Sequence, residues 1–404
     1  MQSQLNKNRL FIASCFALLT TAFAFGIRAG IMNDLVADMS LTDRQLGWIN
    51  FMGIFGFPIA TLIGGPLYNT LGPRKIGNVA FICHFIGITF SILSNSFYTL
   101  FFSTFFISFA NGMVEAAYNP MIASMYTEKR ATMLNRFHVW FPGGIAIGSI
   151  LALLVANIGW GWQLKLSIMY IPAIIYFVMF RGQKFPETRS ESSSSTAENF
   201  KAILKSPIYW VMLICMALTA TTELGTQSWV ERILANSGAQ PLLVLAMVTV
   251  LMAVGRFFAG PLIHRLNITG VLLSSAVIAS VAIYLMSIAT GGMVYFAAIL
   301  FAIGVCYFWP TMISFIAEYQ PKTGALGMSL IGGVGMLGLS IFQPIIGGWI
   351  EGHRATKAAE GLTGEALELA AGQATLANIA IIPMLLIGVF LFIFFWQRKQ
   401  ASQS

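Results

Sequence analysis

Twelve apolar stretches follow one another along the chain, and each is long enough to cross a membrane as a helix. A bilayer core demands about 20 consecutive apolar residues of such a helix. The stretches lie at residues 10–33, 46–71, 76–95, 97–126, 133–158, 162–181, 206–234, 241–265, 269–290, 292–318, 323–350 and 375–397. Only 9% of the residues are charged, against about 25% in soluble domains. The sequence therefore predicts an all-α membrane protein with twelve transmembrane helices.

The basic residues predict how these spans are oriented. Of the 23 Lys and Arg residues, sixteen fall in loops or at span ends on the side of the N-terminus, five, including Lys165, on the opposite side, and two, Arg28 and Arg256, deeper inside spans. Cytoplasmic loops carry the excess of Lys and Arg. We therefore expect both termini in the cytoplasm and the chain in the plasma or inner membrane. Because the net charge of +8 comes largely from these loops, we expect no nucleic-acid partner.

Several classes of chemistry find no support in the sequence. Cys15, Cys83, Cys215 and Cys306 fall singly in apolar runs, which argues against disulfides and against a structural metal site. We find no HExxH, GxSxG or P-loop motif. We expect no enzyme and no cofactor, but a monomer whose partners are the bilayer and a small solute.

Polar segments divide the chain into two halves. The Ser-rich segment 182–205 separates six spans from six, and its composition predicts a flexible cytoplasmic linker between an N-terminal half, 1–181, and a C-terminal half, 206–404. A second polar segment, 352–374, is predicted to form a short external helix.

The two halves echo each other in sequence. GGPLYNTLG at 64–72 matches AGPLIHRLN at 259–267 with an offset of 195 residues, and YNPMIAS at 118–124 matches FWPTMIS at 308–314 with an offset of 190. GGIAIG at 143–148 matches GGVGML at 332–337, with an offset of 189. The constant order of these echoes indicates a duplication. Two six-span halves in parallel repeat are the architecture of the major facilitator superfamily.

The loop GGPLYNTLGPRK also resembles the signature of that superfamily between spans two and three. The matching residues are Gly65, Gly72, Arg74 and Lys75, while Asn69 stands where the signature has an acidic residue. The resemblance implies a pseudo-symmetric carrier in which these four residues serve the conformational change. We assign Arg256 to the same conformational group, because a contact to the loop between spans ten and eleven, or snorkelling to the membrane surface, explains its place near the end of span eight.

A narrower resemblance, to the fucose/proton symporter family, rests on EAAYNPM and LNRFHVWFPGGIAIG. The residues that match are Glu115, Ala117, Asn119 and Pro120 in span four, and Leu134 and Asn135 in span five. His138 stands where that family has a sugar-contacting Gln. Asn33 and Asp34 resemble its Asn-Asp pair in the first span. This resemblance implies a proton-coupled sugar carrier.

Charged residues inside the spans are the first functional candidates. A charge at bilayer depth costs at least about 2.5 to 3.5 kcal/mol and is retained mostly for function. Glu115 lies midway along span four, and we expect it to couple transport to protons, with Asp34 and Glu223 as further candidates. A neutral, structurally hydrogen-bonded Glu115 is the alternative.

Arg28 and Glu223 are 195 residues apart, which is also the offset of the first repeat. They therefore occupy matching positions in spans one and seven. We expect them to form an ion pair, either one that opens during transport or a permanent structural one.

Polar and aromatic residues near the middle of spans predict the substrate site. Sugar hydroxyls need fixed donors and acceptors, and the C–H face of a sugar packs on an aromatic ring. The candidates are Arg28, Asn119, His138, Trp140, Gln227, Trp229, Tyr307 and Trp309. Singly, each aromatic residue has packing or interfacial anchoring as its alternative.

The leading hypothesis is a secondary transporter that imports a sugar or a related polyhydroxylated solute with protons by alternating access. An organic-anion carrier is one alternative, because Arg28 can clamp a carboxylate. A drug/proton antiporter is another, although WFPGGIAIG replaces the run expected in span five of such exporters. Coupling to Na⁺ instead of H⁺ stays open.

Overall fold

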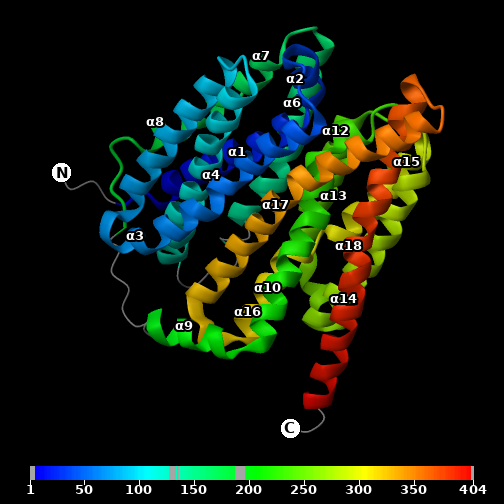
Figure 1. Cartoon of the computed structure of the whole chain (residues 1–404). Coiled ribbons are helices and arrows are strands. Elements are labelled where there is room, and N and C mark those ends of the chain that lie inside the picture. Colours follow the sequence, from blue (N-terminus) through cyan, green and yellow to red (C-terminus); the bar gives the residue numbers. More distant parts are fainter. Residues whose placement is uncertain (1–4, 127–132, 134–135, 187–195, 402–404) are drawn as a thin grey trace. The chain divides into compact units, whose positions relative to one another are not determined.

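The computed structural model of the protein describes residues 5–126, 133, 136–186 and 196–401. Throughout these ranges the regular secondary structure is helical (Figure 1). The chain divides into two compact units, unit 1 (Met1–Ser193) and unit 2 (Ser194–Ser404). The division falls within the segment that we expect to link the two halves.

The helices of unit 1 follow predicted spans one to six. Within the described residues they are α1 (Lys7–Ala29), α2 (Met32–Met39), α3 (Asp43–Ile92), α4 (Phe97–Met125), α6 (Trp140–Asn157), α7 (Trp162–Ser167) and α8 (Tyr170–Phe180). Spans two and three form the two arms of α3, and α7 with α8 forms span six. The short α2 follows span one directly.

The helices of unit 2 begin with α9 (Thr196–Lys205). They continue with α10 (Pro207–Ala220), the π-helix η2 (Thr221–Gly225), α11 (Thr226–Ser228), α12 (Val230–Ile233), α13 (Pro241–Phe257), α14 (Ala259–Ile288), α15 (Gly292–Val305), α16 (Phe308–Tyr319), the 3₁₀ turn η3 (Pro321–Thr323), α17 (Gly324–Ala359) and α18 (Gly364–Ala401). Span seven is therefore built of four consecutive pieces, and span ten of two.

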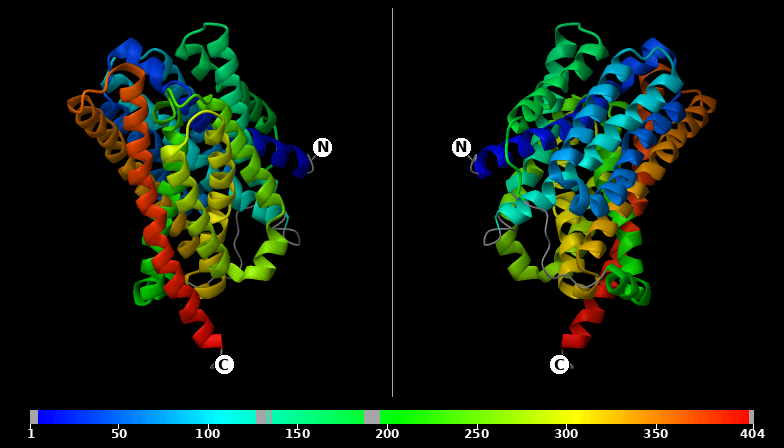
Figure 2. Two further views of the ribbon diagram at one scale, coloured as in Figure 1. Left: turned by 90° about the vertical axis from the view of Figure 1, so that its right-hand side faces the viewer. Right: turned by 90° about the vertical axis from the view of Figure 1, so that its left-hand side faces the viewer.

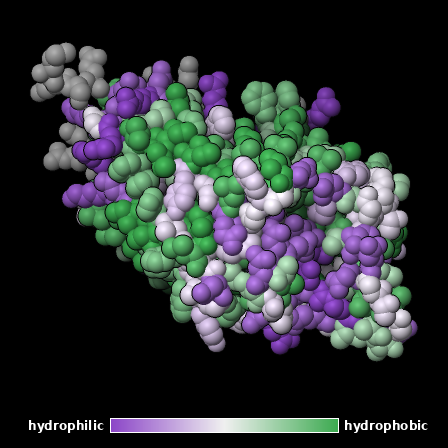
Figure 3. Space-filling view, turned by 90° about the horizontal axis from the view of Figure 1, so that it is seen from above, coloured by the Kyte–Doolittle hydropathy of each residue, from purple (hydrophilic) through white to green (hydrophobic). Residues whose placement is uncertain are grey.

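The prediction of twelve membrane-spanning segments is confirmed. In the described part of the chain, eleven helices are long and apolar enough to cross a membrane, and Pro241–Phe257 is a shorter apolar helix. Their outer faces carry large apolar side chains such as Leu62, Ile214 and Phe392, which are exposed. Hydrophobic residues also cover much of the face shown in Figure 3, between hydrophilic patches. Lipid is the solvent that such surfaces need, since in water they would be costly to expose.

The two echoes at 64–72 and 259–267 end in the same backbone conformation. Gly72 has φ 73° and ψ 163° inside α3, and Asn267 has φ 55° and ψ 173° inside α14. This region of backbone space is almost restricted to glycine. Asn267 is held there by its own side chain, whose Oδ1 accepts from the N–H of Gly270 at 2.9 Å and from Thr269 Oγ1 at 3.0 Å. The repeat seen in the sequence is thus also a repeat of the turn between two spans.

The first arm of α3 packs closely against α4. A Cβ added at Gly56 would clash with the backbone of Phe109, and one added at Gly112 would clash with the backbone of Phe57. Both helices begin with a capping box, at Thr42 and Ser96, which satisfies N–H groups that helix starts leave unpaired. These contacts fix α4, the helix that carries Glu115.

A buried polar group connects three helices of unit 1. His84 of α3 is fully buried, with its Nε2 2.8 Å from Asn111 Oδ1 of α4 and its Nδ1 3.1 Å from the Tyr176 hydroxyl of α8. The amide oxygen only accepts, so Nε2 carries the hydrogen of the bond to Asn111. His84 therefore connects the three helices by hydrogen bonds.

Two expectations about the polar segments need correction. The last ten residues of the predicted flexible linker form α9, because apolar residues spaced for one helix face, such as Ile203, offset the polar average of the segment. The expected short external helix is absent from the described chain, because α17 runs on to Ala359 and α18 begins already at Gly364. Arg354 and Glu368 join the two helix ends by a bidentate ion pair at 2.7 and 2.8 Å. At its other end, α18 extends past the neighbouring helices of its unit (Figure 2).

Candidate functional site

Glu115, Asn119 and His138 form one hydrogen-bonded set in unit 1. Glu115 and Asn119 lie one turn apart on α4, so their side chains share a face, and Asn119 Nδ2 donates to Glu115 Oε2. His138 lies in the helical residues 136–138, just before α6. Its Nε2 lies 3.1 Å from Asn119 Oδ1 and 3.9 Å from Glu115 Oε2. Since Asn119 Oδ1 accepts, the Nε2 of His138 donates to it.

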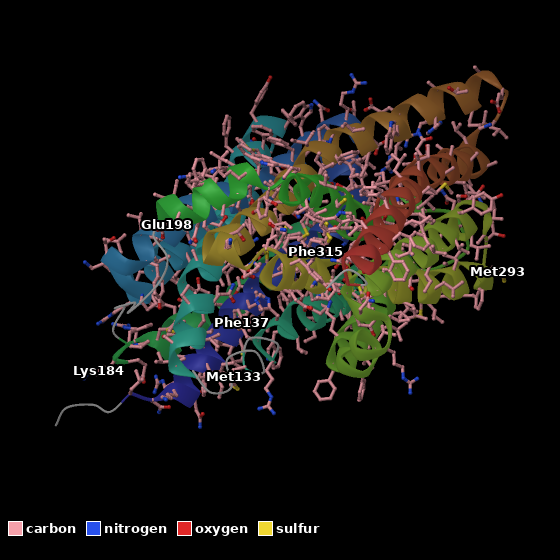
Figure 4. The ribbon with its side chains drawn as sticks, turned by 90° about the horizontal axis from the view of Figure 1, so that it is seen from below. Met133, Phe137, Lys184, Glu198, Met293 and Phe315 are labelled. Atoms are coloured by element: carbon pink, nitrogen blue, oxygen red, sulfur yellow. The ribbon has the colours of Figure 1, made fainter. Side chains whose placement is uncertain are left out.

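The set combines one buried end and one open end. The Glu115 side chain is 16% exposed, whereas that of His138 is 42% exposed. Phe137, labelled in Figure 4, is fully buried and anchors the segment beside His138. Trp140, two residues further on, is also exposed. The arrangement sets a largely buried carboxylate beside a partly exposed imidazole.

Asp34 forms an ion pair with Lys165 of α7. Lys165 Nζ of α7 lies 2.6 Å from Asp34 Oδ2 and 3.1 Å from the carbonyl oxygen of Gly30. The Lys165 side chain is 4% exposed and that of Asp34 is 38% exposed. Trp162 Nε1 also donates to Asp38 Oδ2 at 2.8 Å, so α2 is attached to α7 at two points. Lys165 lies inside predicted span six, and that position was the signal that it is buried.

Arg28 is buried against the backbone of α3. Its Nη1 donates to the carbonyl oxygen of Gly53 at 2.7 Å, and its guanidinium lies 5.1 Å from the centre of the Phe25 ring. A Cβ at Gly53 would clash with the guanidinium. The Nη2 of Arg28 has no hydrogen-bond partner in the described ranges. One donor of Arg28 is thus fixed and another is unused.

Glu223 is paired within its own unit, with Arg256. Arg256 Nη2 lies 2.9 Å from Glu223 Oε1, and Arg256 Nε donates to the carbonyl oxygen of Cys306 at 2.9 Å. Arg28 and Glu223 thus each have a partner within their own unit, and the ion pair expected between the two residues stays a prediction. The expected contact of Arg256 with a loop or with the membrane surface was wrong, because its guanidinium binds the buried carboxylate of Glu223 on span seven.

Gln227, four residues after Glu223, adds a second contact between span seven and α13. Its Nε2 is 3.5 Å from Met252 Sδ, and Met252 precedes Arg256 by one turn of α13. The Oε2 of Glu223 and the Oε1 of Gln227 are buried without a hydrogen-bond partner among the described residues. Glu223 lies in the π-helix η2, a local widening that often marks functional sites.

The remaining aromatic candidates differ in how deeply their side chains are buried and in whether they already have hydrogen-bond partners. Trp229 is fully buried and its Nε1 donates to Gln343 Oε1 at 2.8 Å, so in this conformation its indole packs inside unit 2 and does not face a solute. The Tyr307 hydroxyl donates to the carbonyl oxygen of Gly255 at 3.1 Å. Trp309 is half-buried, with its ring beside Gly335 of α17.

The conformational candidates of the first repeat also differ among themselves. Gly72 needs its glycine for the positive φ described above, whereas a Cβ at Gly65 would meet open space. Arg74 and Lys75 are exposed at the start of the second arm of α3. In the described ranges, no group of three or more His, Cys, Asp or Glu side chains could hold a metal ion.

Comparison with known proteins places this chain in a family. A model described as Major Facilitator Superfamily matches residues 10–343. The chain is 27% identical to a D-xylose transporter of Levilactobacillus brevis over 154 residues, which are 38% of this chain and 34% of that protein. It is 21% identical to the 2-nitroimidazole transporter of Escherichia coli (strain K12) over 239 residues, 57% of this chain and 59% of that protein. Both matches span less than two thirds of the relative's length.

Solved structures show the same fold. The crystal structure of a D-xylose-proton symporter superposes with a TM-score of 0.72 at 12% identity, covering 93% of this chain and 97% of that one. The narrower resemblance to fucose/proton symporters stays a prediction, and Leu134 and Asn135, on which it partly rests, lie outside the described residues. The family model, which covers most of the chain, and the shared fold agree. The chain belongs to the Major Facilitator Superfamily, whose members are membrane transporters and not enzymes.

Proposed function

We propose that the chain is a secondary transporter that moves a sugar or a related polyhydroxylated solute together with protons by alternating access. The observation that carries the proposal is the hydrogen-bonded set of Glu115, Asn119 and His138. It combines a largely buried carboxylate with polar groups that open to the outside of unit 1.

Glu115 is the proton-coupling residue in this proposal. Asn119 donates to the carboxylate, and an amide can go on donating to the carbonyl oxygen after a proton has been taken up. Proton binding therefore changes the charge at Glu115 without dismantling the set. Glu223 and Asp34 rank below it, because each already has a basic partner at 2.9 and 2.6 Å.

The polyhydroxylated solute is supported by the groups around Glu115. His138 is partly exposed and offers a hydrogen-bonding ring nitrogen beside Glu115, and Trp140, two residues further along the chain, is exposed and offers an aromatic face; these are the two kinds of contact that sugars use. The names of a relative and of a structural neighbour, a D-xylose transporter and a D-xylose-proton symporter, point in the same direction.

Two other solutes each have one observation in their favour. An organic anion such as a sugar acid is favoured by Arg28, because its buried Nη2 lacks a partner in the described chain and suits a carboxylate. A drug-like solute exchanged for protons is favoured by the likeness to the 2-nitroimidazole transporter.

The setting we propose is the cytoplasmic membrane, with both termini in the cytoplasm, because sixteen basic residues lie in the loops or at the span ends of that side and cytoplasmic loops carry the excess of Lys and Arg. We propose a monomer that is driven by the proton gradient. No metal or organic cofactor takes part in the proposed cycle.

Uptake into proteoliposomes tests the proposal. A panel of labelled sugars is offered under an imposed inward proton gradient, and at least one should accumulate above its equilibrium level. Glu115→Gln should abolish gradient-driven accumulation but keep counterflow exchange, which needs no net proton movement. Accumulation of no sugar in the panel contradicts sugar symport, and intact gradient-driven uptake by Glu115→Gln moves the proton role elsewhere. Arg28→Ala separates the solutes, because an anion carrier should lose binding and a sugar carrier should retain it.

A further inference from the structure

The helix α9 presents three different faces. Successive residues of an α-helix are about 100° apart, so residues three or four apart share a face. Asn199 and Ile203 are buried on the first face. Phe200 and Leu204 form the second face and are 53% and 54% exposed. Lys201 and Lys205, both exposed, form the third.

The buried face holds α9 against its own unit. α9 packs on η3 and on the start of α17. Just after the helix, Ser206 Oγ donates to Gln320 Oε1 at 2.8 Å, immediately before η3. Lys322 of η3 is exposed, so η3 adds a third basic side chain beside α9. The apolar face is therefore fixed in its orientation by contacts on another face.

The position of α9 in the chain identifies what covers its apolar face. Only Ser206 separates α9 from α10, a membrane-spanning helix whose Trp210 and Ile214 are exposed on its lipid side. α9 runs across the end of α10 and does not continue its axis (Figures 1 and 2). Glu198, labelled in Figure 4, marks the helix as seen from below. A helix that crosses the end of a spanning helix lies in the plane of the bilayer surface.

We propose that α9 and η3 form a docking surface for anionic phospholipids. Phe200 and Leu204 enter the boundary between headgroups and acyl chains, and Lys201, Lys205 and Lys322 contact the headgroup phosphates. A stripe of large apolar residues flanked by lysines is the pattern of helices that lie in this interface, and juxtamembrane lysines attract anionic lipid. The surface belongs to unit 2 alone and does not depend on the solute that is transported.

Spin labelling of the full chain in vesicles tests the proposal. Labels are introduced by Phe200→Cys, Leu204→Cys and, as the matched control on the charged face, Glu198→Cys. All are made in a Cys83→Ala background, since Cys83 is the native cysteine that is not buried. The unmodified background gives the residual labelling. Collision with oxygen reports lipid exposure, and collision with a water-soluble nickel chelate reports water exposure.

In vesicles of phosphatidylcholine with added phosphatidylglycerol, the labels at 200 and 204 should collide several-fold less with the nickel reagent than the label at 198, and more with oxygen. Equal nickel accessibility at 198, 200 and 204 would overturn the proposal. Pure phosphatidylcholine vesicles should raise the nickel accessibility at 200, and Lys201→Gln with Lys205→Gln should remove that lipid dependence. If accessibility at 200 is the same in both vesicles for the native lysines, the recognition of anionic lipid is wrong.

Discussion

Arg256 and Cys306 are joined by a bond that a proline makes available. The carbonyl oxygen of Cys306 would accept from the N–H of residue 310 in a regular helix, but Pro310 has no N–H. Arg256 Nε takes that place at 2.9 Å, and the same guanidinium holds Glu223 at 2.9 Å through its Nη2. The break in span ten therefore positions a buried ion pair between spans seven and eight.

Arg256→Gln should destabilise the protein by about 3 kcal/mol, toward the low end for breaking a buried pair, because the Arg256 side chain is 18% exposed. The cause is the buried Glu223 carboxylate, which loses its counter-charge. Thermal unfolding in detergent measures the loss. Adding Glu223→Gln to Arg256→Gln should recover much of it, and an unchanged midpoint for the single variant would show that the pair contributes nothing.

Pro310→Ala should weaken the ion pair of Arg256 with Glu223 by way of the carbonyl oxygen of Cys306. The new N–H competes with Arg256 for the carbonyl oxygen of Cys306, and the bond at stake contributes about 1 kcal/mol. A double-mutant cycle between Pro310→Ala and Arg256→Gln measures the coupling by unfolding midpoints. Strictly additive effects would mean that the proline does not act through Arg256.

Asp34 and Lys165 should respond unequally to loss of their partner. Asp34→Ala leaves a buried ammonium with the Gly30 carbonyl oxygen as its remaining hydrogen-bond partner in the described chain, which should cost about 3 kcal/mol. Lys165→Met leaves a carboxylate that is 38% exposed and can be hydrated, so it should cost about 1 kcal/mol. Unfolding midpoints of the two variants decide the order. Equal losses would mean that the exposure of the two partners does not control the effect.

Gly72 and Asn267 should respond differently to alanine and glycine. Gly72→Ala places a Cβ in a backbone region that costs about 1 to 3 kcal/mol for other residues. Asn267→Gly removes that strain as well as the side-chain bonds to residues 269 and 270, so its net effect should be small. Asn267→Ala keeps the strain that is already present in the protein and loses the bonds, so it should be less stable than Asn267→Gly in thermal unfolding.

The spans could be predicted from the sequence because length and apolar content suffice to recognise them. The turn at Gly72 and its echo at Asn267 were visible for the same reason, as a local motif repeated at a fixed offset. The grouping of Glu115 with Asn119 was accessible too, since both lie one turn apart on one helix. In each case the residues concerned are close together in the sequence.

The partners of the buried charges were not accessible in this way. Glu223 and Arg256 are brought together by the register of two helices, and Arg256 and Cys306 by the break at Pro310, neither of which the apolar pattern encodes. Arg28 and Glu223 are 195 residues apart, like the first repeat, and this suggested that they are partners. A repeat, however, relates positions in the two halves and does not say which side chains are in contact. The burial of Trp229 was not accessible either, because it depends on the contact of its indole with Gln343 of α17.

The turn at Gly72 has a consequence for how the chain tolerates changes in length. Two spans joined through a single non-helical residue have no loop residues that could absorb an insertion, unlike spans joined by an exposed loop. One residue inserted there would rotate the following helix by about 100° around its axis and turn its lipid-facing side chains toward α4 and α8. Insertions and deletions at residues 70–75, and at 265–270 in the second unit, should therefore disrupt the fold far more than insertions in the Ser-rich segment between the two units.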